Sequence, residues 1–270
     1  MKKKRRGELL IIGGNEKKNP ADEEQAAILR HVARAATGNG RLVILTVASS
    51  EPEEMERVYR AAFARLGVKH FDCLDIRTRE EAVAGKGIEK LDGASVLFFT
   101  GGDQLRITSL MGGTPVMDHI FGLHEAGAAI VGTSAGAAAA AETMLGFGES
   151  NVSRLTQLTL APGLGLLKGV IIDQHFAERG RFGRLMGAVA QNPHSLGIGI
   201  DEDTAIHVMN DEEFTVLGSG AVYVFDATGM TYTSLSDRHS EGILTVHDTK
   251  VHMLGRGDRF SLVSRRPLPH

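Results

Sequence analysis

The chain has 270 residues, of which 42% are hydrophobic and 23% are charged, and its formal net charge at pH 7 is -3. This composition is typical of a globular protein with a substantial buried core. The modest charge, three tyrosines and no tryptophan disfavour a nucleic-acid-binding surface, so we interpret residues 1–6, which hold five basic side chains, as a solvated basic tail.

Cysteine content and hydropathy exclude several further classes of protein. Cys73 is the single cysteine, which rules out an intrachain disulfide and any site built from several cysteines of one chain. The apolar run after the basic start covers only Leu9–Ile12, too short for a signal-peptide core, and no run has the length of a membrane span. We therefore expect a cytoplasmic protein without membrane or nucleic-acid partners.

Apolar runs and helical patterns alternate along the first half of the chain. We expect strands at residues 8–12, 41–47, 70–76, 94–100 and 128–132, and helices at residues 22–36, 53–66, 104–110 and 117–126. This alternation predicts right-handed crossovers and an α/β fold with a mostly parallel sheet flanked by helices. Sites in such sheets lie at the carboxyl ends of the strands, where Gly14, Gly102 and Ser134 fall.

The second half begins with a polar, glycine-containing connection at residues 146–165, which we expect to be a loop near the site. A strand at 169–173, a helix at 177–190 and a strand at 196–200 follow. The alternating runs at 205–209, 215–217, 221–225 and within 242–262 predict antiparallel strands. With no linker and no repeat, residues 1–270 are expected to form a single domain, with residues 204–265 as its β-rich C-terminal extension.

Ser134 stands where an apolar strand meets an alanine-rich run, residues 135–145, that favours a helix. The small residues Gly132, Ala135 and Gly136 permit a tight strand-to-helix corner, as in the elbow that exposes a nucleophilic serine. The helix N-terminus also offers unpaired N–H groups to an oxyanion. The alternative is that Ser134 only caps an ordinary helix.

A serine nucleophile needs a base, and the base needs a group that fixes its tautomer. His175 is the strongest candidate base because it ends an apolar strand, and Glu202 ends another strand and could hold the imidazole. The neighbouring Asp201 and Asp203 could serve instead, and the spacing does not decide between them. An α/β-hydrolase, with the order Ser, acid, His, ranks second because it would need a late histidine: His239, His247 or His252.

Two further groups of residues suggest how a substrate could be held. The turn at Gly102 follows a neighbouring strand, and its N–H could complete an oxyanion hole with that of Ala135, although a glycine chosen only for its dihedral angles is equally compatible. The guanidinium groups of Arg179, Arg181 and Arg184 suggest an acidic group on the substrate. A solvated charged face remains the default for any one of them.

Five segments of the chain form a distinctive set: TGGDQ at 100–104, GTSAGA at 132–137, GLGLL at 163–167, DQHF at 173–176 with the three arginines that follow, and GIDE at 199–202. By these segments, in this order, the chain resembles cyanophycinase over residues 8–265. The elbow alone would also fit the related dipeptidase E.

The resemblance implies a serine peptidase on a fold similar to class I glutamine amidotransferases. Its substrate would be cyanophycin, a polyaspartate backbone with an arginine on each side chain, cleaved to β-aspartyl-arginine dipeptides. It also implies a homodimer without metal or organic cofactor. Transferred residue by residue, it implies Ser134 as nucleophile, His175 as base and Glu202 as orienting acid, and a substrate pocket lined by Gln104, Asp173, Gln174, Arg179, Arg181 and Arg184. Of these, Asp173 is expected to receive the substrate guanidinium.

Two other functions remain open from the sequence. One is an aspartyl dipeptidase of the dipeptidase E type, which would cleave short peptides rather than the polymer. The other is a non-catalytic binding relative, in which the hydroxyl of Ser134 would not react with serine-directed reagents.

Overall fold

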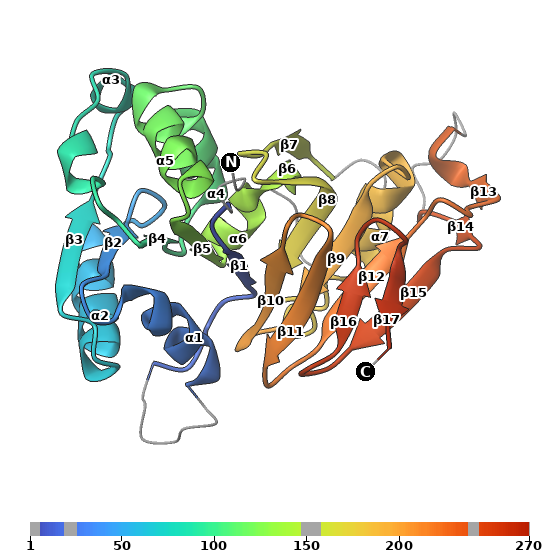
Figure 1. Ribbon diagram of the computed structural model, residues 1–270. Coiled ribbons are helices and arrows are strands. Elements are labelled where there is room, and N and C mark those ends of the chain that lie inside the picture. The colour runs from blue at the N-terminus through green and yellow to red at the C-terminus, as the bar shows by residue number, and fades with distance from the viewer. Residues whose placement is uncertain (1–5, 19–25, 147–157, 237–242, 270) are drawn as a thin grey trace, which may run out of the picture.

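The computed structural model describes residues 6–18, 26–146, 158–236 and 243–269, and its strands form two large sheets (Figure 1). The first sheet has nine strands in the order β17-β16-β11-β10-β1-β5-β4-β2-β3. Their bounds, in the same order, are Arg266–Leu268, Arg259–Ser261, Glu213–Gly218, Thr204–Met209, Leu9–Ile12, Ala129–Thr133, Val96–Phe99, Arg41–Leu45 and His70–Leu74. Strands β1 to β5 in this sheet pair in parallel, and β10, β11, β16 and β17 extend it antiparallel beyond β1.

The second sheet has six strands in the order β15-β12-β9-β8-β6-β7. Their bounds are Lys250–Leu254, Val222–Asp226, Leu196–Ile200, Leu167–Gln174, Ala141–Leu145 and Leu160–Pro162. Strands β6, β8 and β9 pair in parallel, whereas β7, β12 and β15 pair antiparallel. A separate ribbon joins β13 (Tyr232–Thr233) to β14 (Val246–His247).

Helices cover both large sheets. The seven α-helices of the described residues are α1 (Ala27–Ala36), α2 (Pro52–Arg65), α3 (Arg79–Val83), α4 (Gln104–Met111), α5 (Pro115–Glu125), α6 (Ala135–Ala140) and α7 (Phe182–Gln191). One 3-10 turn follows α3, at Ile88–Lys90, and another follows β13, at Ser234–Ser236. Local sequence explains where several helices begin. Pro52 and Pro115 occupy the first positions of α2 and α5. The side chains of Asp103 and Thr114 accept hydrogen bonds from backbone N–H groups in the first turns of α4 and α5.

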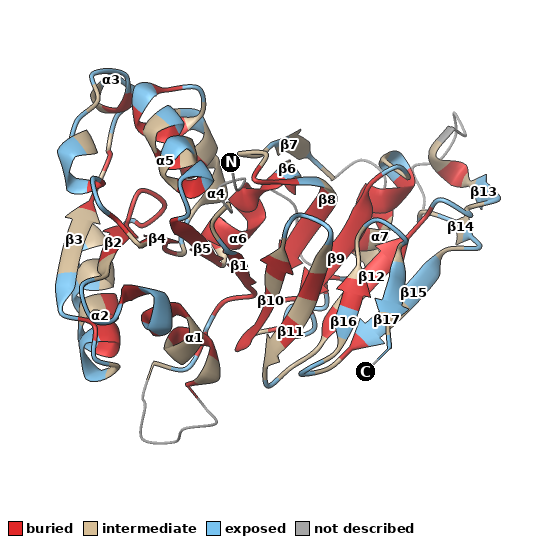
Figure 2. Cartoon of the chain, viewed as in Figure 1, coloured by how far each residue is buried: buried red, intermediate tan, exposed pale blue. Residues whose placement is uncertain are grey.

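The apolar core is divided by the first sheet. Alternate residues of the inner strands point to opposite faces: Leu10 and Ile12 pack with α1 and α2, while Leu9 and Ile11 face the core shared with α4 to α6 and the second sheet. Helix α7 packs on the outer face of the second sheet. Because the central strands are buried on both faces, they carry continuous apolar runs, and Figure 2 shows burial concentrated in them.

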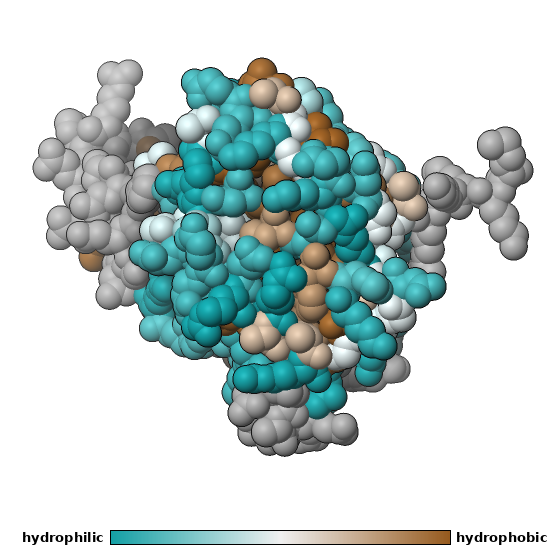
Figure 3. Space-filling view, turned by 90° about the vertical axis from the view of Figure 1, so that its left-hand side faces the viewer, coloured by the Kyte–Doolittle hydropathy of each residue, from teal (hydrophilic) through white to brown (hydrophobic). Residues whose placement is uncertain are grey.

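The surface opposite the second sheet is predominantly polar. The view onto the β3 edge, with α2 and α3 nearby, shows mostly hydrophilic residues with smaller apolar areas between them (Figure 3). Among the described residues, no helix combines the length and the apolar composition needed to cross a membrane.

The expected α/β class, with parallel strands flanked by helices, is confirmed, but three local predictions are wrong. The helix expected at 135–145 ends at Ala140, because Ala141–Leu145 pairs as β6 with both β7 and β8. The helix expected at 177–190 starts only at Phe182, after a turn. The expected loop at 146–165 contains β7. Residues 147–157 of this predicted loop lie outside the described part of the chain, as do residues 22–25 of the first predicted helix and residues 1–5 of the basic tail.

Candidate active site

Ser134 occupies a strained corner between β5 and α6. Its φ of +53° and ψ of -106° are unusual for a residue with a side chain. The corner is tight on both sides: a Cβ on Gly132 would lie 2.4 Å from the carbonyl oxygen of Gly136, and one on Gly136 would lie 2.7 Å from that of Phe99. The Ser134 N–H donates to the carbonyl of Ile12 on β1 at 3.0 Å, which ties the elbow to the neighbouring strand.

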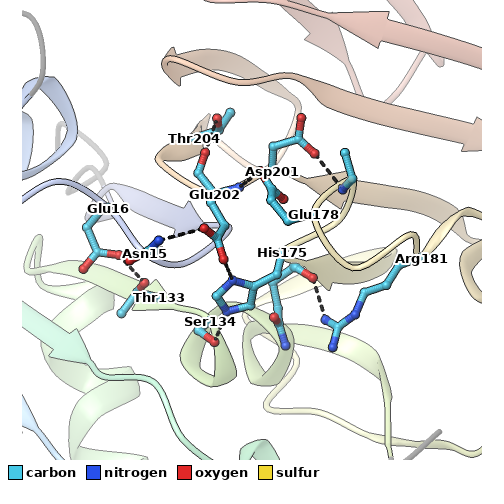
Figure 4. Close-up of polar contacts among 12 residues, drawn as sticks. Asn15, Glu16, Thr133, Ser134, His175, Glu178, Arg181, Asp201, Glu202 and Thr204 are labelled. Carbon is cyan, nitrogen blue, oxygen red and sulfur yellow. Dashed lines mark hydrogen bonds and ion pairs between the residues drawn. The ribbon is translucent and has the colours of Figure 1, made fainter. Parts of the chain in front are cut away.

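His175 lies between Ser134 and Glu202 (Figure 4). The Oγ of Ser134 is 2.9 Å from Nε2 of His175, and Nδ1 of His175 is 2.6 Å from Oε1 of Glu202. With Nδ1–H donating to the carboxylate, Nε2 is left as the acceptor for the serine hydroxyl. The serine follows β5 of the first sheet, whereas the histidine and the glutamate follow β8 and β9 of the second, so the three side chains meet where the two sheets join.

The surroundings of His175 favour its neutral form. Only 8% of the residue is exposed, and this burial is the main reason why its pKa lies below the usual 6.5; nearby Arg179 acts in the same direction, while the hydrogen bond to Glu202 opposes it. The pKa of Glu202 is also lowered, chiefly by a hydrogen bond from Asn15 and further by its contact with His175. A neutral imidazole beside an ionised carboxylate can accept the proton of a serine hydroxyl.

The end of β1 packs directly against the imidazole. The His175 N–H donates to the carbonyl of Gly13 at 2.8 Å. A Cβ on Gly14, whose φ is +103°, would lie 2.4 Å from Cε1 of the His175 ring, and a Cβ on Gly13 would lie 2.1 Å from the carbonyl oxygen of Asp201. These two glycines therefore let the first sheet approach the ends of β8 and β9.

Asn15 and Glu16 belong to the site, and the sequence reasoning missed both. Nδ2 of Asn15 donates to Oε2 of Glu202 at 2.7 Å. The buried carboxylate of Glu16 accepts hydrogen bonds from Thr133, next to the serine, and from the phenol of Tyr59, both at 2.6 Å. The available signal was the Gly-Gly-Asn turn directly after a buried strand, since glycine and asparagine tolerate the positive φ values found there.

The glycine turn after β4 lies beside the serine. A Cβ on Gly101 would be 3.3 Å from Cβ of Ser134, and the exposed Gly102 has a φ of +139° that favours glycine. The N–H of Asp103 donates to the carbonyl of Ala48 at 2.9 Å, which fixes the turn. Ala135 begins α6 immediately after Ser134. The backbone N–H groups of Gly102 and Ala135 thus belong to segments that flank the hydroxyl.

Asp173, Arg181 and Arg184 differ from their expected role in a substrate pocket. They form a buried ion cluster behind the site, each between 1% and 6% exposed. Arg184 donates through Nε to Oδ2 of Asp173 at 2.7 Å and through Nη2 to Oδ1. Arg181 donates through Nη1 to Oδ1 at 3.1 Å. The carboxylate that we expected to receive a substrate guanidinium therefore already holds two guanidinium groups of this chain.

The buried ion cluster supports the strand end that carries His175. Arg181 also donates to the carbonyl of Gln174, the residue before the histidine. Burial lowers the pKa of Arg181 to about 10, against the opposing attraction of Asp173, so this guanidinium stays charged at neutral pH. The side-chain oxygen of Gln174 is buried without a hydrogen-bond partner among the described residues.

Arg179 and Gln104 have different positions from the buried arginines. Arg179 is exposed in the turn after His175, with its N–H bonded to the histidine carbonyl at 3.1 Å. Gln104 is half-buried at the start of α4 and donates from its amide to the carbonyl of Leu145 at 3.0 Å. Glu178 accepts a hydrogen bond of 3.2 Å from the N–H of Glu202. Of the three predicted arginines, Arg179 is the one that solvent can reach.

Glu202, rather than Asp201 or Asp203, is the acidic residue that contacts the imidazole of His175. The carboxylate of Asp201 accepts backbone bonds from Ala177 and Ala221 at 2.9 and 3.1 Å, and that of Asp203 accepts one from Lys17 at 3.0 Å. Both aspartates therefore brace loops rather than the imidazole.

The late histidines of the second-ranked prediction do not replace His175 at the serine. The ring of His247 packs beside that of Tyr232, and the ring of His252 beside that of Phe260, while His239 lies outside the described residues. The group of possible metal ligands found in the described part of the chain, Glu8, His31 and His207, lies at the other end of β1.

The sequence matches peptidase family S51 over residues 9–216. The chain is 40% identical over 238 residues to a cyanophycinase of Trichormus variabilis, an alignment that covers 87% of this chain and 80% of that protein. It is 36% identical over 244 residues to a cyanophycinase of Geminocystis herdmanii, covering 89% and 90% respectively.

The fold is also similar to that of a solved peptidase from an acI-B1 actinobacterium. The TM-score is 0.70, and the alignment covers 96% of this chain and 98% of that one. At 21% identity, this likeness supports the fold alone.

Proposed function

Because this chain belongs to peptidase family S51, we propose that it is a serine-type cyanophycinase that releases β-aspartyl-arginine dipeptides from the polymer. The observation that carries the catalytic part of this proposal is the contact of His175 with Ser134 at 2.9 Å on one side and with Glu202 at 2.6 Å on the other. The relatives of 36–40% identity that are named cyanophycinases supply the substrate.

In the first half of the proposed reaction, Oγ of Ser134 attacks the carbonyl carbon of a backbone aspartyl residue. Nε2 of His175 takes the hydroxyl proton, and Glu202 stabilises the imidazolium through Nδ1–H. The N–H groups of Gly102 and Ala135 donate to the oxyanion of the tetrahedral intermediate. When the C–N bond breaks, His175 returns the proton to the leaving amine, and an acyl group remains on Ser134.

In the second half, water attacks the acyl carbon while His175 again takes a proton. Collapse of this second intermediate breaks the ester bond, and the proton passes from His175 to Oγ of Ser134. The reaction adds one water across each peptide bond and needs neither a redox partner nor an energy-carrying co-substrate. Burial of His175 supports both steps, because a lowered pKa keeps the imidazole available as a base at neutral pH.

In this proposal the exposed guanidinium of Arg179 pairs with an aspartyl carboxylate of the polymer. The half-buried Gln104 offers its side-chain amide, and the buried Gln174, next to His175, offers a side-chain oxygen that has no hydrogen-bond partner among the described residues. We assign Asp173, Arg181 and Arg184 to the support of the His175 strand end, because their charges are buried and mutually paired. We further propose that the protein acts as a cytoplasmic homodimer, which light scattering and localisation of a tagged protein would test.

Incubation of the purified protein with insoluble cyanophycin tests the activity directly. We expect the polymer to dissolve and the β-aspartyl-arginine dipeptide to appear by mass spectrometry. The Ser134→Ala variant should lose activity by about 10⁴-fold or more; unchanged activity in this variant would refute the serine mechanism.

Two further experiments distinguish a cyanophycinase from a dipeptidase and from a non-catalytic binding protein. Cleavage of short aspartyl dipeptides without release of product from the polymer would favour a dipeptidase of the dipeptidase E type. Labelling by a fluorophosphonate should occur in the wild-type protein and not in Ser134→Ala. A folded wild-type protein that neither labels nor cleaves either substrate would support a binding relative.

A further inference from the structure

Three potential metal ligands meet on the α1 side of the first sheet. Glu8 directly precedes β1, and His207 lies on β10 opposite Leu10 of β1. Because Glu8 and Leu10 are two residues apart on an extended strand, they share a face. Leu10 packs into the core beneath α1, the helix that carries His31. The topology thus brings one carboxylate and two imidazoles from three separate elements to one place.

The distances among these three side chains match a metal-binding arrangement. Oε2 of Glu8 is 3.4 Å from Nε2 of His31 and 3.4 Å from Nε2 of His207, and all three ligand atoms lie within 4.8 Å of one another. Around a tetrahedral ion with bonds of about 2.0–2.1 Å, neighbouring ligand atoms are separated by about 3.4 Å. Both carboxylate-to-imidazole separations therefore correspond to two ligands on one ion.

Apart from their contacts with Glu8, the two imidazole nitrogens have no polar contact that accounts for their burial among the described residues. Nε2 of His31 and Nε2 of His207 are buried atoms without a hydrogen-bond partner among the described residues. Their rings lie close, with centroids 4.6 Å apart and planes inclined by 59°. Buried polar atoms are normally satisfied by hydrogen bonds. Both nitrogens lie 3.4 Å from the same carboxylate oxygen of Glu8, so one ion bound between the three side chains would satisfy both of them.

From this geometry we propose that Glu8, His31 and His207 form a binding site for one divalent transition-metal ion, with Zn²⁺ the best match. Two imidazoles and one carboxylate are ligands that zinc accepts, whereas Ca²⁺ and Mg²⁺ prefer oxygen ligands alone. The side chain of Glu8 is 57% exposed, compared with 25% for His31 and 14% for His207. The exposed side of Glu8 therefore gives an ion access to the site from solvent.

The position of this site indicates a structural role rather than a catalytic one. Glu8 precedes β1, while the residues that contact His175 follow the same strand. A bound ion would link α1, the parallel strand β1 and the antiparallel strand β10. Because the ion binds the folded chain, it stabilises that state by mass action.

Thermal unfolding of untagged, metal-stripped full-length protein tests the proposal. We expect micromolar Zn²⁺ to raise the unfolding temperature by several degrees and calorimetry to give one ion per chain. Glu8→Gln, His31→Gln and His207→Gln should each weaken binding at least tenfold. His70→Gln, which changes an exposed histidine of β3, is the matched control and should bind like wild type.

Two additional measurements test whether zinc binds at His175 instead and whether the loss of metal binding in a variant reflects unfolding. His175→Gln should keep the zinc response, because the proposed site does not involve the catalytic histidine. Co²⁺ added to wild type should give the visible absorption of a tetrahedral site, and Glu8→Gln, whose substitution lies at the exposed ligand, should remain folded and lack it. The absence of a zinc response in wild type, or a response preserved in both His31→Gln and His207→Gln, would overturn the proposal.

Discussion

Asn15 donates a hydrogen bond of 2.7 Å to the oxygen of Glu202 that His175 does not use. The carboxylate is therefore held from two sides, with an amide on Oε2 and an imidazole on Oε1. This contact joins the loop after β1 to the loop after β9. It gives Asn15 a positioning role that acts through the glutamate rather than on the substrate.

Replacement of Asn15 should reduce turnover more than substrate binding. We expect Asn15→Gly, which tolerates the native φ of +47°, to lower kcat about tenfold with little change in KM, because one charge-assisted hydrogen bond is lost. Asn15→Asp should be worse, since a second carboxylate would face Glu202. Steady-state kinetics measure both effects, with the exposed Asn39→Ala as control; a wild-type kcat in Asn15→Asp would contradict the role.

A methyl group at Gly14 should displace the imidazole of His175, the proposed base. A Cβ there would lie 2.4 Å from the ring of His175, so we expect Gly14→Ala to lower kcat about 100-fold, the effect of misplacing a reacting group by about 1 Å. Gly93→Ala provides the matched control, because Gly93 also has a positive φ, of +72°, but open space around it. Gly93→Ala should keep wild-type activity, and equal activities of the two variants would contradict the predicted displacement of the imidazole.

The pH profile should report the burial of His175. The base works only when neutral, and its pKa lies below 6.5, so kcat/KM should rise with pH through an acid limb centred below 6.5 and stay level above it. Glu202→Gln removes the carboxylate that favours the imidazolium. The limb should then move to lower pH while kcat falls by about 10³ to 10⁴-fold. An acid limb above pH 7 in wild type would contradict this assignment.

Replacing the buried Arg184 should lower stability, whereas replacing the exposed Arg179 should weaken substrate binding. Arg184→Met leaves Asp173 with less compensation in a buried cluster, and the free energy of unfolding should fall by about 3–5 kcal/mol. The exposed Arg179→Met should leave stability within about 0.5 kcal/mol and raise KM for cyanophycin. Thermal unfolding and kinetics distinguish the two. Unchanged stability in Arg184→Met, together with a raised KM, would restore the expected substrate contact.

The local features of the site could be read from the sequence. The apolar run before Ser134 and the small residues around it predict a strand-to-helix corner, and strand ends predict the neighbourhoods of His175 and Glu202. These patterns are short-range, so periodicity and turn chemistry are sufficient to find them. The single-domain interpretation stays a prediction.

Long-range pairing explains what the sequence did not reveal. The alanine-rich run favours a helix throughout, yet Ala141–Leu145 gains strand partners on both sides, and tertiary pairing outweighs weak helix propensity. The division of the strands between two sheets likewise depends on register between distant segments. Asp173 carries no local sign that two arginines will enclose it.

The proposed catalytic apparatus cannot assemble before the first 202 residues of the chain have been made. Asn15 and Glu202 are separated by 187 positions, and the ribosome delivers Ser134 long before the glutamate. Contacts between such remote segments form late, because closing a long loop costs conformational entropy before the contacts it permits can stabilise the chain. On this proposal, a growing polypeptide carries its serine in an inert state, and the capacity to cut peptide bonds arises together with the finished tertiary structure.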